Sequence, residues 1–408
     1  MSYLKRKKKR KRKKRSEVMI EQSDINIGMF GHVDHGKTTL VSAISNVWTD
    51  KHSESIKRSM TIKLGYADAI IKKRVENGKE ILTTQGKGEE VRRISLLDNP
   101  GHESLMSTVI ASSSLIDAAI LVIAANEPCP MPQTFEHFLI LQILGLKNIV
   151  IAQTKIDLVT KEKAIAHYNQ IKEFVKGTFA ENCDIIPVVA NFKINIEYLL
   201  EAIMKFPKRD PKENLPPIMY VARSFDVNKP GKLDKLVGGV IGGSLIQGKL
   251  KVGDEIEIRP GIKKGNQTVP VFTTIESIRT SMNELKEAKG GGLIALSTDL
   301  DPSFTKSDGL IGSIVGKPGT LPEPKKELIL EYHQIPRKDL PQNLFVVNEP
   351  VVLGIGTGVH VGFVKKVKKE LLEIELKHEA CTLKGEKIAI SRRIAQRWRL
   401  VGYGEEKS

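Results

Sequence analysis

A glycine-rich segment, Gly31-His-Val-Asp-His-Gly-Lys-Thr38, has the most informative residue spacing in the chain. It fits the pattern GxxxxGK[ST], in which glycines let backbone N–H groups approach phosphate oxygens closely. Lys37 adds a positive charge at the β- and γ-phosphates, and the hydroxyl of Thr38 suits Mg²⁺. The apolar run Ile25–Phe30 precedes the segment and a helical pattern follows it, so a helix N-terminus points at the same anions. The segment predicts a nucleotide phosphate site.

Two further tetrapeptides indicate which nucleotide binds. Asp98-Asn-Pro-Gly101 follows the apolar run Ile94–Leu97, where Asp98 can hold Mg²⁺ through water and the Gly101 amide can sense a γ-phosphate. Thr154-Lys-Ile-Asp157 ends another apolar run, and Asp157 can accept both N–H donors on the edge of guanine. Adenine has no such pair, so it would leave a buried carboxylate unpaired. Because ligands bind at the carboxyl ends of parallel strands, the three motifs together predict a Mg²⁺-dependent GTPase.

Two residues near these motifs are candidates for switching and catalysis. Thr61 lies between the first two motifs, where a threonine completes the Mg²⁺ shell only while the γ-phosphate is present; taken alone, it reads as an ordinary loop residue. His102 directly follows Gly101 and is the candidate for orienting the attacking water, since phosphoryl transfer depends on orientation and charge neutralisation. His32 and His35 are not assigned to catalysis.

Alternating elements must position these residues. Between Ile25 and Phe206 short apolar runs alternate with amphipathic stretches of helical length, which predicts a parallel sheet covered on both faces. The predicted strands are Ile25–Phe30, Ile94–Leu97, Ala118–Ala125, Ile149–Thr154 and Ile185–Val189, and the predicted helices are Thr38–Val47, Phe135–Leu144, Ala164–Lys176 and Ile196–Met204.

The remaining chain has a different texture. Proline-rich breaks at 207–217 and 316–324 separate two series of short β-rich runs with glycine turns, which is typical of small barrels. The predicted architecture is an α/β P-loop GTPase domain followed by two β-barrel domains. Its predicted parts are a basic tail at 1–23, a GTP-binding domain at 24–207 and barrels at 215–318 and 325–408.

Composition limits the class of protein. The net charge of the 408 residues is +16, and the unbroken basic run Lys5–Arg15 supplies 11 of these charges, which leaves +5 for the rest. The run is either a solvated tail or an arm for nucleic acid. Three cysteines without a CxxC pair exclude a disulfide framework and a Cys-rich zinc site. No apolar run reaches the ~18 residues of a membrane span, so a cytoplasmic protein without membrane contact is expected.

The motif residues carry a family resemblance. His32-Val-Asp-His35 and Pro100-Gly-His102 resemble the translational GTPases, whose G domain is followed by two β-barrels. Longer stretches resemble the gamma subunits of archaeal and eukaryotic translation initiation factor 2, over almost everything from Asp24 to Gly404. These stretches are Trp48–Glu54, Thr61–Ala67, Ala222–Gly231, Asp301–Asp308 and Ile390–Leu400.

The resemblance implies a function and a set of site residues. It implies a GTP-dependent carrier of methionylated initiator tRNA that hydrolyses GTP and works with alpha and beta subunits on the small ribosomal subunit. The implied phosphate-binding residues are Asp34, His35, Gly36, Lys37, Thr38, Thr39 and Gly101, and the implied guanine-binding residues are Thr154, Lys155, Asp157, Val189, Ala190 and Asn191. The implied metal ligands are Thr38, Thr61 and Asp98, with Asp34 and Ser59 beside a second Mg²⁺.

Several positions depart from the family pattern. Archaeal relatives have a Cys-rich zinc knuckle, but residues 67–93 contain no cysteine, so zinc is not expected and Val75–Lys79 predicts a hairpin turn instead. Thr154 stands where the family has Asn, which predicts weaker bracing of the phosphate loop. Two other functions stay open: an elongation-type carrier of aminoacyl-tRNA, and a nucleotide-dependent RNA-binding assembly factor with negligible hydrolysis.

Overall fold

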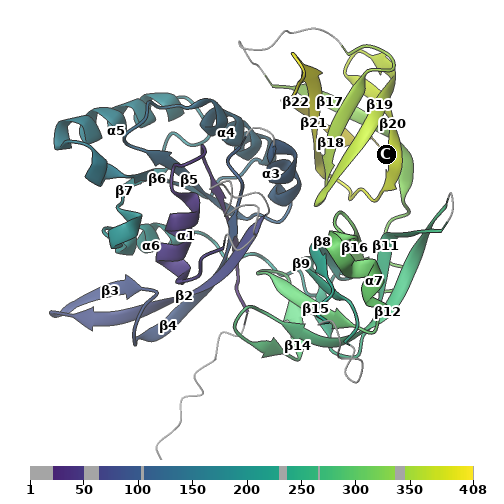
Figure 1. Ribbon diagram of the computed structural model, residues 1–408, viewed down its shortest axis with the longest axis horizontal. Helices are drawn as coiled ribbons and strands as arrows, with labels where there is room; N and C mark the ends of the chain where they lie inside the picture. The colour runs from purple at the N-terminus through teal and green to yellow at the C-terminus, as the bar shows by residue number, and fades with distance from the viewer. Residues whose placement is uncertain are drawn as a thin grey trace, which may run out of the picture.

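The computed structural model describes residues 22–49, 64–102, 105–228, 237–264, 267–335 and 345–407. The basic run Lys5–Arg15 and two predicted metal ligands, Ser59 and Thr61, lie outside these ranges. An α/β domain is followed along the chain by two β-barrels (Figure 1). The predicted fold class is therefore confirmed.

A seven-stranded sheet forms the centre of the α/β domain, in the order β3-β2-β4-β1-β5-β6-β7. The strands β4, β1, β5, β6 and β7 are parallel, and β2 and β3 form an antiparallel hairpin at one edge. Because helices cover both faces, β1 and β5 are buried along their whole length and read as continuous apolar runs. The strands are β1 (Asn26–Phe30), β2 (Gly65–Glu76), β3 (Lys79–Thr83), β4 (Glu89–Asp98), β5 (Ala118–Ala124), β6 (Ile149–Thr154) and β7 (Asp184–Pro187).

Helices pack on the two faces of this sheet and form two separate cores (Figure 1). Helices α1 (Lys37–Ser45) and α6 (Ile196–Met204) bury residues such as Leu40 and Leu199 in one core. The other core contains α3 (Met106–Ser113), α4 (Pro132–Leu144) and α5 (Lys161–Val175), and it continues into both barrels. Two 3₁₀ turns, η2 (Ile156–Leu158) and η3 (Ala190–Phe192), follow β6 and β7.

Six strands close each barrel. In the first barrel, β11 pairs with both β16 and β12, which closes the circuit β11-β16-β8-β9-β15-β12. Its strands are β8 (Ile218–Phe225), β9 (Val240–Gln247), β11 (Glu255–Lys264), β12 (Gln267–Arg279), β15 (Ile294–Thr298) and β16 (Ile314–Gly316). Shorter elements accompany them: β10 (Lys249–Lys251), β13 (Glu284–Leu285), β14 (Glu287–Lys289), α7 (Pro302–Thr305) and η4 (Lys306–Asp308).

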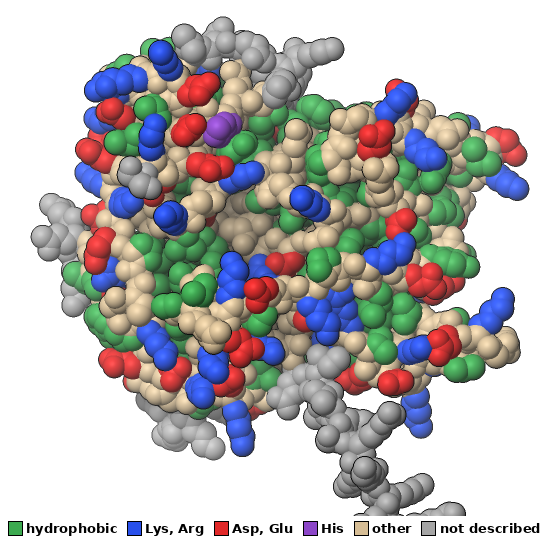
Figure 2. All heavy atoms as spheres, turned by 180° about the vertical axis from the view of Figure 1, so that it is seen from behind, with side chains coloured by type: hydrophobic (Ala, Val, Ile, Leu, Met, Phe, Trp, Pro, Cys, Tyr) green, Lys and Arg blue, Asp and Glu red, His purple; other side chains and the backbone are tan. Residues whose placement is uncertain are grey.

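The second barrel closes in the order β17-β20-β19-β18-β21-β22. Its strands are β17 (Lys325–Gln334), β18 (Pro350–Ile355), β19 (Gly358–Lys368), β20 (Leu371–Ala380), β21 (Lys387–Ile394) and β22 (Arg397–Glu406). Several of its cations are paired: Lys365 with Glu375 at 2.6 Å, and Arg392 with Glu349 at 2.6 Å. The face seen in Figure 2 likewise carries basic and acidic side chains interspersed, in keeping with the small net charge outside the basic run.

Several elements were not anticipated from the sequence, among them α3 and β19, and also β15 and β16 of the first barrel. The turn expected at Val75–Lys79 is confirmed, because Glu76 pairs with Lys79 around Asn77 and Gly78. The strand expected at Ile185–Val189 is shorter and earlier, at Asp184–Pro187, because the chain turns into η3 after Val189.

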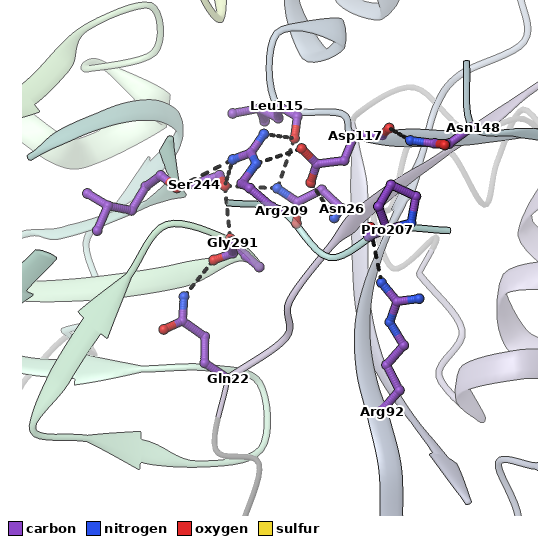
Figure 3. Close-up of polar contacts among 12 residues, drawn as sticks. Gln22, Asn26, Arg92, Leu115, Asp117, Asn148, Pro207, Arg209, Ser244 and Gly291 are labelled. Atoms are coloured by element: carbon purple, nitrogen blue, oxygen red, sulfur yellow. Dashed lines mark hydrogen bonds and ion pairs between the residues drawn. The ribbon is translucent and has the colours of Figure 1, made fainter. Parts of the chain in front are cut away.

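Polar contacts connect the α/β domain to the first barrel at the start of β1 (Figure 3). The amide side chain of Asn26 donates to Leu115 O at 2.9 Å and to Ser244 Oγ of β9 at 2.8 Å. Asp117 accepts the Asn26 backbone N–H at 2.8 Å and Arg209 Nε at 2.6 Å. Burial raises the pKa of Asp117, while Arg209 acts in the opposite direction. The link between the domains is therefore a partly buried ion pair supported by backbone contacts.

Candidate nucleotide-binding site

The glycine-rich loop connects β1 to α1 through an irregular backbone. Asp34 (φ 60°) and Gly36 (φ 90°) both have left-handed conformations, which curl a backbone into a concavity where N–H groups bind anions. At Gly31 (φ 137°) an added Cβ would lie 2.2 Å from Val122 O, so only glycine fits beside β5. Thr38 and Thr39 follow in the first turn of α1. The loop therefore has the shape expected for a phosphate site.

Lys37 lies buried under this loop. Its Nζ donates to Gly31 O at 2.9 Å and to His32 O at 2.6 Å. Burial lowers the pKa of Lys37 to about 8, while Asp98 and Asp34 act in the opposite direction. A Cβ added at Gly101 would lie 2.4 Å from the same Nζ, so the predicted γ-phosphate sensor touches the predicted phosphate lysine. The tertiary structure thus brings the first two motifs together.

Two of the predicted magnesium ligands, Thr38 and Asp98, also meet. Asp98 is fully buried at the end of β4, and its Oδ2 accepts the hydroxyl of Thr38 at 2.7 Å. The same oxygen accepts the hydroxyl of Thr49 at 2.7 Å. Mg²⁺ prefers hard oxygen ligands. The Asp98 carboxylate and the Thr38 hydroxyl are such ligands and lie beside the predicted phosphate site, so these residues fit the ion.

Two buried histidines support the loop from behind. His35, predicted as a phosphate-binding residue, has a fully buried side chain with Nδ1 3.1 Å from Val122 O and Nε2 3.2 Å from Glu127. Burial lowers the pKa of His35 to about 4, although Glu127 acts in the opposite direction. Its side chain thus contacts β5 and the residues after it, which leaves the backbone of His35 as the group for phosphate.

His137 on α4 is a site residue that the sequence did not indicate. Its Nδ1 accepts the backbone N–H of Gly31 at 2.7 Å. Complete burial, reinforced by the charge of Lys37, holds the pKa of His137 well below its usual range, so the ring is a neutral acceptor. One histidine among the apolar residues of α4 gives no sequence signal for a contact more than 100 positions away.

The guanine motif lies at the same edge of the sheet. The hydroxyl of Thr154, at the end of β6, donates to His35 O at 2.6 Å. Thr154 therefore braces the phosphate loop through one hydrogen bond, and bracing weaker than that of the family's Asn stays a prediction. Lys155 (φ 56°) then turns the chain so that Asp157 lies exposed in η2, and none of the described residues donates a side-chain hydrogen bond to it.

The loop Val189–Asn191 follows the neighbouring strand. Gln153 of β6 is in register with Pro187 of β7, so the loops after the two strands start side by side. Val189 is buried, Asn191 is exposed, and Ala190 begins η3. The predicted guanine-binding residues therefore lie on two adjacent loops beside the phosphate loop.

His102 is among the residues that line a cavity of about 630 Å³ between the α/β domain and the second barrel, together with Met106, Val352, Val359 and Trp398. The neighbouring Gly101 contacts Lys37. The structure thus places His102 between the phosphate site, one residue away, and the cavity beside the second barrel. Its catalytic role remains a prediction.

Comparison with known families agrees with this fold and site. The family described as "Elongation factor Tu GTP binding domain" matches residues 22–208, and "Elongation factor Tu domain 2" matches residues 238–305. "Initiation factor eIF2 gamma, C terminal" matches residues 332–406. The α/β domain, the phosphate loop and the following barrels define a translational GTPase, and GTP hydrolysis is the activity of that class.

Full-length relatives narrow the assignment. "Translation initiation factor 2 subunit gamma" of Methanococcus maripaludis (strain C6) is 52% identical over 94% of this chain and 98% of its own length. The protein of the same name from Archaeoglobus fulgidus is 48% identical over 93% of this chain and 94% of its own. The chain belongs to the family of translation initiation factor 2 gamma subunits, and it is an initiation-factor GTPase.

Solved structures share the three-domain fold. A bacterial selenocysteine-specific elongation factor has a TM-score of 0.74 at 25% identity; the alignment covers 94% of this chain and 58% of that longer one. The elongation factor SelB of Methanococcus maripaludis with a GTP analogue has a TM-score of 0.73 at 21% identity, covering 95% of this chain and 80% of that one. Within the described residues, no helix is long and apolar enough to span a membrane.

Proposed function

We propose that this protein, in its GTP-bound state, carries methionylated initiator tRNA to the small ribosomal subunit in the cytoplasm. It does so with the alpha and beta subunits of the same factor, the alpha subunit on the first barrel and the beta subunit on the α/β domain. The family membership supports this proposal, since the matched relatives cover nearly the whole chain.

The nucleotide is held from three directions. Backbone amides of residues 34–39 surround the phosphates, Lys37 exchanges its loop carbonyls for phosphate oxygens, and Asp157 accepts the N–H donors of guanine. Mg²⁺, when bound, would neutralise phosphate charge, and Asp98 and Thr38 would hold it together with Thr61. By the family resemblance, Asp34 and the carbonyl of Ser59 would hold a second Mg²⁺. The single observation that carries the nucleotide-binding part of this proposal is the approach of Gly101 to Lys37 and of Asp98 to Thr38.

Hydrolysis requires His102 to orient water at the γ-phosphate. Because the sequence shows no arginine finger in cis, we expect slow intrinsic hydrolysis until a ribosomal or protein activator acts on the site. His102→Ala should reduce activated hydrolysis in single-turnover assays and leave GTP affinity nearly unchanged. A large loss of GTP affinity would assign a structural role to this histidine.

Selective tRNA binding tests the carrier function. With a non-hydrolysable GTP analogue, the protein should bind methionylated initiator tRNA more tightly than methionylated elongator tRNA or uncharged initiator tRNA. Equal affinity for all three would refute the carrier function.

An elongation-type carrier is the second candidate, and the likeness to the selenocysteine-specific elongation factor and to SelB is the observation that favours it. Its signature would be equal binding of the two methionylated tRNAs with weak binding of the uncharged one.

A further inference from the structure

The segment that contains Thr61, called the first switch region below, is flanked on both sides by residues close to Asp98, the proposed Mg²⁺ ligand. Residues 50–63 lie outside the described ranges, but Thr49 and Gly65 on either side are described. The hydroxyl of Thr49 donates to Asp98 Oδ2 at 2.7 Å. Gly65, the first residue of β2, is the register partner of Asp98 in β4. One residue therefore lies beside both ends of this segment: Asp98 accepts from Thr49 through its carboxylate and neighbours Gly65 through its backbone.

A side chain at position 65 would collide with Thr49. A Cβ added at Gly65 would lie 2.7 Å from Thr49 Cβ and 3.2 Å from both Thr49 Oγ1 and Asp98 Cβ. Gly65 is not among the residues with positive φ, so backbone conformation does not require glycine there. The close approach of Thr49 to Asp98 does require it.

The oxygen that Thr49 contacts is also the oxygen that binds Thr38. Asp98 Oδ2 accepts both hydroxyls at 2.7 Å, one from the phosphate loop and one from the start of the switch region. The terminal torsion of an aspartate is broad, so hydrogen-bond donors decide how its carboxylate is rotated. Two donors from different directions restrict the plane of the carboxylate more than either does by itself, and Thr49 supplies one of them.

We propose that Thr49 is a positioning residue for Mg²⁺: its hydroxyl orients the Asp98 carboxylate and ties the entrance of the switch region to occupancy of the metal site. This inference rests on the nucleotide site proposed above. Thr49 itself does not contact the ion in this proposal. Its substitution should therefore change the Mg²⁺ concentration that nucleotide binding requires. Groups that orient metal ligands in this way typically contribute 10- to 100-fold to metal affinity.

The test measures release of a fluorescent GDP analogue by stopped flow across a Mg²⁺ titration, with excess EDTA as the metal-free reference. Thr49→Val removes the hydroxyl at nearly constant volume, and Thr49→Ser keeps the hydroxyl as a matched control. Gly65→Ala leaves Thr49 intact but displaces it from Asp98. Thermal unfolding of each variant in EDTA without nucleotide reports any general loss of stability.

The expected result is a rise of about tenfold in the Mg²⁺ concentration that half-maximally slows GDP release, for both Thr49→Val and Gly65→Ala. Thr49→Ser should stay near the wild-type value, and release in EDTA should change little in any variant. An unchanged Mg²⁺ midpoint in Thr49→Val would overturn the inference, as would equally faster release with and without Mg²⁺. If Mg²⁺ does not slow release from the wild-type protein, the nucleotide site itself is wrong, and this inference fails with it.

Discussion

The buried lysine of the phosphate loop predicts that guanine nucleotide affinity falls at mildly alkaline pH. Burial lowers the pKa of Lys37 to about 8 in the protein described here. Bound phosphates favour the ammonium form, so nucleotide binding raises this pKa. The affinity for nucleotide is therefore highest at pH values below the Lys37 pKa of the nucleotide-free protein. It falls as the pH rises from that pKa toward the higher Lys37 pKa of the complex.

The magnitude follows from the fraction of protonated lysine. With a pKa of about 8, Lys37 is roughly 90% protonated at pH 7 and roughly 10% at pH 9. If only the protonated form binds tightly, the Kd for GDP at pH 9 is about tenfold higher than at pH 7, or about 1.4 kcal/mol. A lysine with the ordinary pKa of about 10.4 would change the Kd little over this range.

Isothermal titration calorimetry at constant ionic strength and saturating Mg²⁺ measures this dependence. Near pH 8.5 the measured binding enthalpy should increase with the ionisation enthalpy of the buffer, because the protein takes up a proton from the buffer when the nucleotide binds. Lys37→Met provides the control, since ionisation of guanine at alkaline pH affects both proteins and cancels in the ratio of their Kd values. A ratio that stays constant between pH 7 and pH 9 would refute the assignment of a lowered Lys37 pKa.

Three substitutions test other parts of the structure. Asp157→Ala removes the acceptor for two guanine N–H groups and should weaken GTP binding at least about 100-fold without improving ATP binding, as competition assays would show. His137→Leu leaves the buried N–H of Gly31 without an acceptor, which should cost about 1–3 kcal/mol in urea unfolding and also weaken GDP binding. Asp117→Asn breaks the ion pair with Arg209; because both side chains keep some exposure, the expected loss of unfolding free energy is near the lower end for buried pairs, about 3 kcal/mol.

Each of these has a result that contradicts it. If Asp157→Ala still prefers GTP over ATP as strongly as the wild-type protein, guanine must be recognised by the loop Val189–Asn191 instead. A His137→Leu protein with wild-type stability would mean that Gly31 finds another acceptor. An Asp117→Asn protein that unfolds at the wild-type urea concentration would show that the ion pair adds little to the interface seen in Figure 3.

Elements with strong local signals were predictable from the sequence. The parallel strands β1, β5 and β6 are continuous apolar runs, and the structure has them within a residue or two of the predicted bounds. The unpredicted elements have weak local signals. Half of α3 consists of Ser and Thr, which favour helices poorly, and β19 contains Lys365, Lys366 and Lys368, although lysine is uncommon in strands.

The sequence by itself determined the nucleotide chemistry, because the phosphate loop, Asp98–Gly101 and Thr154–Asp157 are short motifs whose function depends on neighbours a few positions apart. Only the tertiary structure decided which groups support that chemistry. His137 holds Gly31, Thr49 holds Asp98 and Thr154 braces His35, each across a long stretch of chain. Such contacts arise when the sheet and helices pack, so no local pattern of residue types encodes them.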